Sequence, residues 1–266
     1  MIATVTTPRS LLGIEDLAAD ELHALLDLAA LMKRHPLAWR GALEGRAVAC
    51  LFERPWTRGR VSLEVAVHRL GALPVVLERS GGIEETARLL SSYCDAIAIR
   101  TDHHRDLLDL AAHATVPVIN ALTDAAHPCR ALADCLTLRE RFGELAGLEV
   151  AYVGGREPAM HSLIEAAIRT GMTVHVAAPE ALLPDPALLA RAGTAVRVCE
   201  SAREAVTDVV AVYAAAARSD LPSAFSVTPE LLSYAAPRAV MVDASPDLLP
   251  VEQAVLRVLV TGDWEI

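Results

Sequence analysis

Lysine is almost absent from this 266-residue chain. Lys33 is the one lysine, so 23 of the 24 basic residues are arginine. Schiff-base enzymes and P-loop nucleotide hydrolases both need a positioned lysine, and Lys33 lies in a polar Met-Lys-Arg-His stretch that fits neither class. We therefore exclude both classes. Any anion site is expected to use arginine, whose planar guanidinium suits phosphate and carboxylate groups.

Aromatic residues, long apolar runs and cysteine pairs are also scarce. Aromatics make up 4% of a chain that is 53% hydrophobic, so the core is built mainly from Ala, Leu and Val. No apolar run approaches the ~18 residues of a membrane span, and the first ten residues lack the apolar stretch of a secretory signal. The five cysteines contain no CxxC pair, which argues against a zinc site or a disulfide framework. We expect a cytoplasmic protein with no membrane partner and no metal.

Positive charge is in deficit. The formal net charge is −10 and the isoelectric point is near 5.4, while the mean hydropathy is +0.34. An acidic surface repels phosphates everywhere except at a local basic patch. We therefore expect no nucleic-acid partner.

Strand and helix patterns alternate along the whole chain. This alternation predicts an α/β fold with two parallel-sheet domains linked by long helices, over residues 1–130 and 131–245, with a C-terminal helix at 246–260 that packs back on the first domain. A ligand site is expected in the cleft between the domains. The predicted strands are 47–52, 74–77, 96–100, 116–119, 149–153, 173–177, 195–198, 209–213 and 239–243, and the main helices are 14–35, 60–70, 83–93, 105–112 and 128–142.

The segment FERPWTRGR, residues 52–60, joins a predicted strand to a predicted helix. Helix N-termini carry free N–H groups and partial positive charge, so an anion is expected here, with Thr57 as the cap and Arg58 or Arg60 as a charged donor. The alternative is a purely structural helix start whose arginines pair with Glu53 and Glu64.

Three further positions end predicted strands or begin predicted helices. Arg100 ends a strand and is expected at the same sheet edge as the anion loop. His127 precedes a helix that starts with proline; it is either a structural histidine or a hydrogen-bond donor to a carbonyl or phosphate oxygen. Gly154-Gly155 gives only weak support to dinucleotide binding, because the full glycine motif is interrupted.

Four stretches together resemble the aspartate/ornithine transcarbamoylase family, closest to its ornithine branch: FERPWTRGRVSLEVAVHRLG, IAIRT, VPVINALTDAAHPCRALADCLTLRERFG and LEVAYVG. The resemblance is dense from Leu12 to Met172 and thin afterwards. It implies an N-terminal domain that binds carbamoyl phosphate and a C-terminal domain that binds an amino-acid acceptor. It also implies a homotrimer with active sites at subunit interfaces, and no cofactor.

The family's phosphate loop reads Ser-Thr-Arg-Thr-Arg. Thr57, Arg58 and Arg60 match it, while Trp56 and Gly59 replace two hydroxyl donors. Trp56 either stacks on a ligand or fills the phosphate pocket. We expect an anion in this pocket, or an Asp or Glu side chain from a neighbouring loop.

Two carbonyl-side residues match the family and one departs from it. The resemblance implies that Arg100 bridges the phosphate and the carbonyl oxygen and that His127 donates to the carbamoyl oxygen. Arg130 replaces the glutamine of a His-Pro-x-Gln motif, which removes an acceptor for the carbamoyl NH₂ group. It either contacts substrate or plugs the pocket.

The acceptor half departs further from the family pattern. Pro158 stands where the ornithine branch has Asn, residues 213–218 replace an Asp-x-x-x-Ser-Met-Gly loop, and residues 243–246 replace His-Cys-Leu-Pro. A polar loop is shortened near residues 80–82. These losses predict that ornithine carbamoyltransferase activity is absent.

Three functions remain from the sequence alone. The first is a divergent carbamoyltransferase that uses an anionic phosphate donor and an amine acceptor other than ornithine. The second is a non-catalytic paralogue that binds a small anion or partners a true transcarbamoylase, and the third, weakly supported, is a nicotinamide-dependent oxidoreductase. The predicted catalytic residues are Arg58, Arg100 and His127, and the predicted substrate-binding residues are Trp56, Thr57, Arg60 and Arg130.

Overall fold

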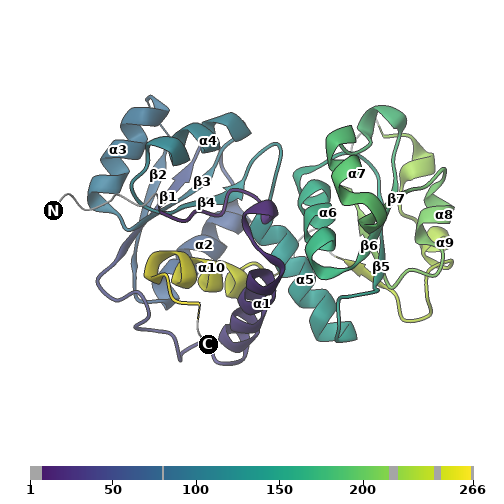
Figure 1. The fold of residues 1–266 in the computed structure, drawn as a ribbon, viewed down its shortest axis with the longest axis horizontal. Helices are drawn as coiled ribbons and strands as arrows, with labels where there is room; N and C mark the ends of the chain where they lie inside the picture. The colour runs from purple at the N-terminus through teal and green to yellow at the C-terminus, as the bar shows by residue number, and fades with distance from the viewer. Residues whose placement is uncertain (1–7, 80, 216–220, 243–246, 265–266) are drawn as a thin grey trace. The chain divides into compact units, whose positions relative to one another are not determined.

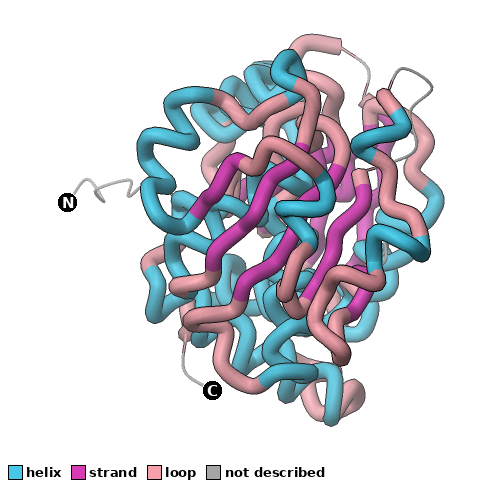
Figure 2. Tube along the Cα trace, turned by 90° about the vertical axis from the view of Figure 1, so that its right-hand side faces the viewer, coloured by secondary structure: helices cyan, strands magenta, loops and turns pink. Residues whose placement is uncertain are grey.

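The computed structural model of the chain describes residues 8–79, 81–215, 221–242 and 247–264 (Figure 1). Its contacts divide into two compact units. Unit 1 comprises Met1–Cys129 and Asp247–Ile266, and unit 2 comprises Arg130–Pro246. Each unit has its own parallel sheet, whose strands run side by side among helices (Figure 2). The α/β class with two parallel sheets is therefore confirmed.

Unit 1 is a four-stranded parallel sheet in the order β2-β1-β3-β4. Its strands are β1 (Ala47–Phe52), β2 (Leu73–Glu78), β3 (Ala96–Arg100) and β4 (Val118–Leu122). The chain runs from β1 to β2 on one side and then crosses to β3 on the other, so the direction of winding switches between β1 and β3.

Helices cover both faces of the unit 1 sheet (Figure 1). On one face, Leu51 and Ile99 pack with Leu90 of α3 and Leu107 of α4 in a buried cluster. On the other, α10 packs against α1 and α2. Residues 14–16 form a 3-10 turn before α1, and the five helices are α1 (Ala19–Arg34), α2 (Thr57–Arg69), α3 (Ile83–Tyr93), α4 (His104–His113) and α10 (Leu249–Thr261).

Unit 2 is a five-stranded parallel sheet in the order β7-β6-β5-β8-β9. The winding direction switches between β5 and β8, which pair in parallel. The strands are β5 (Glu149–Val153), β6 (Thr173–Ala177), β7 (Val196–Val198), β8 (Ala211–Ala214) and β9 (Val240–Val242). The helices are α5 (Pro128–Phe142), which begins at the unit boundary, α6 (Pro158–Thr170), α7 (Pro186–Ala192), α8 (Ala202–Val206) and α9 (Pro229–Leu232).

Most predicted elements are present; some have the predicted bounds and others have shifted ends. The strands expected at 47–52, 96–100, 149–153 and 173–177 and the helices at 83–93 and 128–142 have the predicted bounds. Helix α2 begins three residues earlier than predicted, at Thr57, and β4 lies at 118–122 rather than 116–119. All five cysteines are buried free thiols. In the part of the chain that the structure describes, no helix is long and apolar enough to cross a bilayer.

Candidate active site

The loops that follow β1 and β3 meet at the winding switch of unit 1. In open parallel sheets, ligands bind beyond the carboxyl ends of the strands at such a switch. Here the Glu53 backbone N–H donates to the Arg100 carbonyl at 3.0 Å, which ties the first loop to the end of β3. The site is therefore built at the edge where the sequence placed Arg100.

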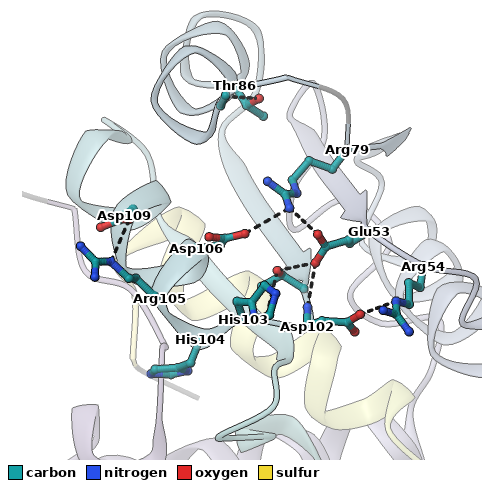
Figure 3. A network of polar contacts seen from close by, with 12 residues as sticks. Glu53, Arg54, Arg79, Thr86, Asp102, His103, His104, Arg105, Asp106 and Asp109 are labelled. Atoms are coloured by element: carbon teal, nitrogen blue, oxygen red, sulfur yellow. Dashed lines mark hydrogen bonds and ion pairs between the residues drawn. The ribbon is translucent and has the colours of Figure 1, made fainter.

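Glu53 holds three loops together with one carboxylate (Figure 3). It accepts hydrogen bonds from the Thr101 hydroxyl at 2.7 Å, from the Asp102 backbone N–H at 2.8 Å and from Arg79. Partial burial alone would raise its pKa, but these three hydrogen bonds lower the pKa of Glu53 to about 2. The carboxylate is thus ionised throughout the neutral range.

Arg79 and Arg54 extend this network (Figure 3). Arg79 also reaches Asp106 of α4 at 3.1 Å, and Arg54 pairs with Asp102. The alternative interpretation of the loop paired its arginines with Glu53, whereas the partner of Glu53 is Arg79, which follows β2. Sequence spacing gives no signal for this pair, because the two residues meet only when β1 and β2 align.

Trp56, rather than Thr57, is the N-cap of α2. The predicted cap is therefore wrong: Thr57 is the first helical residue, and the indole has no oxygen to accept the free N–H groups. The first bond of the helix runs from the Arg60 N–H to the Trp56 carbonyl at 2.8 Å. The backbone N–H groups of residues 57–59 accordingly lack partners within the helix.

The charged residues of α2 differ in their surroundings. Arg58 is exposed, and among the described residues no acidic side chain pairs with it. The Arg60 guanidinium donates to Glu64 one turn along the helix at 2.7 Å, as the structural interpretation expected. A cavity of about 240 Å³ lies beside this helix start and is lined by Phe52, Glu53, Arg54, Pro55, Trp56, Arg60 and Glu78.

Arg100, His127 and Trp56 come together around the start of α2. The Trp56 and His127 ring centres lie 5.7 Å apart in an edge-on arrangement, and the Arg100 guanidinium carbon lies 6.0 Å from the Trp56 ring centre. Arg100 is mostly buried and donates to the Arg54 carbonyl at 3.1 Å. Asp102 lies 4.0 Å from Arg100, so an acidic loop side chain does approach this arginine.

Arg130 lies in unit 2. Its guanidinium donates to both oxygens of Asp134, at 3.1 and 2.9 Å, one turn along α5. Asp134 is buried, and burial raises its pKa to about 7 in spite of Arg130. The structure therefore shows Arg130 in an intrahelical ion pair.

The winding switch of unit 2 carries a group of polar residues that the sequence did not single out. Tyr152 and Tyr213 are paired neighbours on β5 and β8, with their rings stacked 6.1 Å apart. The Tyr152 hydroxyl donates to Glu157 at 2.8 Å. The Tyr213 hydroxyl is buried with no hydrogen-bond partner among the described residues.

Comparison with known proteins identifies the family. Residues 9–140 match the aspartate/ornithine carbamoyltransferase, carbamoyl-P binding domain. The ornithine carbamoyltransferase of Acidothermus cellulolyticus is 41% identical over 263 residues, covering 90% of this chain and 84% of that protein. The chain belongs to the aspartate/ornithine carbamoyltransferase family.

Family members align over nearly the whole chain. The ornithine carbamoyltransferase of Hyperthermus butylicus is 35% identical over 97% of this chain and 91% of its own length. The crystal structure of the Thermus thermophilus ornithine carbamoyltransferase superposes with a TM-score of 0.90 at 36% identity, covering 96% of this chain and all of that one. The Gloeobacter violaceus enzyme superposes with a TM-score of 0.87 at 35% identity.

These relatives overturn the functional prediction. An acceptor other than ornithine, the absence of ornithine carbamoyltransferase activity and the non-catalytic alternative all rested on replaced motif residues and on replaced or shortened loops. The relatives that align over both halves of the chain are ornithine carbamoyltransferases, which points to ornithine instead.

The loss of a polar side chain at 158 leaves the backbone of a helix start in place. Pro158 is the first residue of α6, and backbone N–H groups at a helix start bind carboxylates without any particular side chain. Of the replaced loop at 213–218, residues 216–218 lie outside the described residues, as do residues 243–246.

Proposed function

We propose that this protein is an ornithine carbamoyltransferase, which transfers the carbamoyl group of carbamoyl phosphate to the side-chain amine of ornithine. One observation carries the proposal: an ornithine carbamoyltransferase that is 41% identical aligns with 90% of the chain, including both units. The match of residues 9–140 to a carbamoyl-P binding domain supports unit 1 as the donor side.

The start of α2 is the proposed phosphate site. The free N–H groups of residues 57–59 and the helix dipole favour a dianion, and the exposed Arg58 adds a charged donor. Thr57 can add a hydroxyl. Arg60 is already engaged by Glu64, so we assign it a secondary, electrostatic role.

Arg100 and His127 are the proposed carbonyl-side groups. The uncharged amine attacks the carbonyl carbon, a C–N bond forms, and the carbonyl oxygen gains negative charge. The C–O bond to phosphate then breaks, and one proton passes from nitrogen to phosphate, giving citrulline and hydrogen phosphate. Arg100 and His127 would stabilise the charged oxygen as positioned donors, and the helix start would stabilise the leaving phosphate.

Glu157 is the proposed acceptor-side residue of unit 2. It follows β5 at the winding switch, where ligands bind in such sheets. The hydrogen bond from Tyr152 orients its carboxylate, which suits the α-ammonium group of an amino acid. Arg130 holds Asp134 beside the same strands and is assigned a positioning role.

We also propose that copies of the chain assemble as a homotrimer through unit 1. Large apolar side chains remain exposed there in a single copy, notably Leu73 at 63%, on the edge strand β2, and Val61 at 56%, on α2. Assembly would remove such surface from water. Light scattering of the purified chain measures the number of copies.

A citrulline assay tests the function. The chain should form citrulline from carbamoyl phosphate and ornithine at about 1 s⁻¹ or faster, and aspartate should give no carbamoylated product. Arg58→Ala removes a charged hydrogen bond to phosphate and should weaken carbamoyl phosphate binding roughly ten- to a hundredfold. No citrulline from the unaltered chain, with carbamoyl phosphate bound, would refute the proposal.

A further inference from the structure

The Trp56 side chain covers the first turn of α2. A Cβ atom built on Gly59 would overlap three atoms of the indole six-membered ring, so the ring lies directly on the Gly59 backbone. Gly59 is buried, although Thr57, Arg58 and Arg60 around it are exposed. The conformation of Gly59 does not itself require glycine, since its φ lies outside the left-handed region. The absence of a side chain at 59 is what admits the ring.

The two proposed carbonyl-side residues also lie near the ring. His127 lies edge-on to it, and Arg100 lies near its face at 6.0 Å, the outer limit of a cation–π contact. The ring therefore lies on the helix start, with its centre within about 6 Å of both carbonyl-side groups. Those are the groups that a bound carbamoyl phosphate needs.

An indole and a phosphate cannot share this place. The aromatic face carries partial negative charge, so it attracts a guanidinium and repels a dianion. A phosphate that reached the N–H groups of residues 57–59 would displace the ring from Gly59. It would also replace the ring as the partner of Arg100.

We propose that Trp56 is a gate on the donor site: its ring closes the start of α2 in the free chain and swings off Gly59 when carbamoyl phosphate binds. This inference rests on the proposed function, because it takes the start of α2 as the carbamoyl phosphate site. The closed state lowers the apparent affinity by the fraction of molecules that are open. Trp56 thereby raises the concentration of carbamoyl phosphate that half-saturates the site.

Two variants of the chain separate a gate from a binding platform. Trp56→Ala removes the ring without adding a hydroxyl donor, and it should tighten the binding of carbamoyl phosphate and of inorganic phosphate, measured by calorimetry, about tenfold if the open fraction is about a tenth. Gly59→Ala pushes the ring out by its new Cβ. In a Trp39→Phe/Trp264→Phe background, where Trp56 is the one remaining tryptophan, this change should raise acrylamide quenching of fluorescence without any ligand.

Phosphate added to the same background should raise quenching to the level seen with Gly59→Ala. Gly41→Ala is the matched control, because a Cβ there meets only one carboxylate oxygen at 3.9 Å, and it should change neither quantity. Equal or weaker anion binding by Trp56→Ala, or quenching that Gly59→Ala leaves unchanged, overturns the gate alone. If neither the unaltered chain nor Trp56→Ala binds either anion, the proposed function fails and the gate falls with it.

Discussion

The Glu157 carboxylate is oriented before any ligand binds. The hydrogen bond from Tyr152 already orders this carboxylate, because the tyrosine ring is fixed by stacking on Tyr213. Binding of the acceptor therefore loses little conformational entropy at Glu157. Burial raises the pKa of Tyr152 above its ordinary range, so its hydroxyl stays protonated and continues to donate. In its proposed role, Glu157 is expected to affect the binding of the acceptor alone.

Glu157→Gln should therefore raise the KM for ornithine about tenfold or more, since the amide carries no charge for an ammonium group. The KM for carbamoyl phosphate should change less than twofold, because that substrate is assigned to unit 1. Steady-state kinetics with each substrate varied in turn measure both constants. A parallel rise in both would assign Glu157 to the stability of the site rather than to the acceptor.

At the scale of elements, helix α2 and strand β4 show where the sequence pattern predicted the position of an element but misplaced its ends. Apolar runs located the centres of the buried strands because burial on both faces demands them. The start of α2 was missed because Gly59 has low helix propensity and Trp56 offers no capping oxygen. The local sequence therefore carries no signal for a helix that begins at Thr57.

Strand β4 was predicted, but its bounds were placed too early in the chain for a complementary reason. Pro117 has no N–H to donate, which delays the strand, and the polar Asn120 ended the apolar run. In the structure, Asn120 is fully buried and its side-chain N–H group donates to the Leu12 carbonyl at 2.7 Å. Only the folded chain supplies that partner. Likewise, the Glu53 and Arg79 pair depends on strand order, which local pattern does not encode.

The contact between α10 and α2 contains a buried acid and makes stability depend on pH. Glu252 accepts a hydrogen bond from Ser62, yet burial raises the pKa of Glu252 to about 8. Its pKa in the unfolded chain is about 4.3, so between these values the folded state holds a proton that the unfolded state lacks. The free energy of unfolding should fall as pH rises from about 4.3 to 8 and then level off.

Glu252→Gln should flatten this decline, because the amide stays neutral at every pH. Part of the slope remains, since burial also raises the pKa of Asp134. Urea unfolding at several pH values from 5 to 8 measures the slope, and Glu85→Gln on the exposed side of α3 should keep the original one. A Glu252→Gln slope equal to that of the unaltered chain would contradict the assignment.

At the scale of the whole molecule, α10 completes a unit that begins some 230 residues earlier. Leu256 on this helix is 1% exposed, so Leu256→Ala should lower the free energy of unfolding by about 2–5 kcal/mol. Hydrogen exchange should show lost protection in α1 and α2 while β5 and β8 keep theirs. Glu85→Ala, at an exposed position of α3, should change stability by less than about 0.5 kcal/mol. Equal losses in both units would mean that they unfold as one.

The order of the segments also governs how the chain is made. Unit 2 lies between the two parts of unit 1, so a ribosome must synthesise all of it before α10 appears. At about 5–20 residues per second, that takes roughly 6–23 seconds. During this interval α1 and α2 lack the helix that packs against both of them, so the apolar surface that α10 covers in the finished protein stays open to water. This is the window in which a chaperone has an apolar surface to hold.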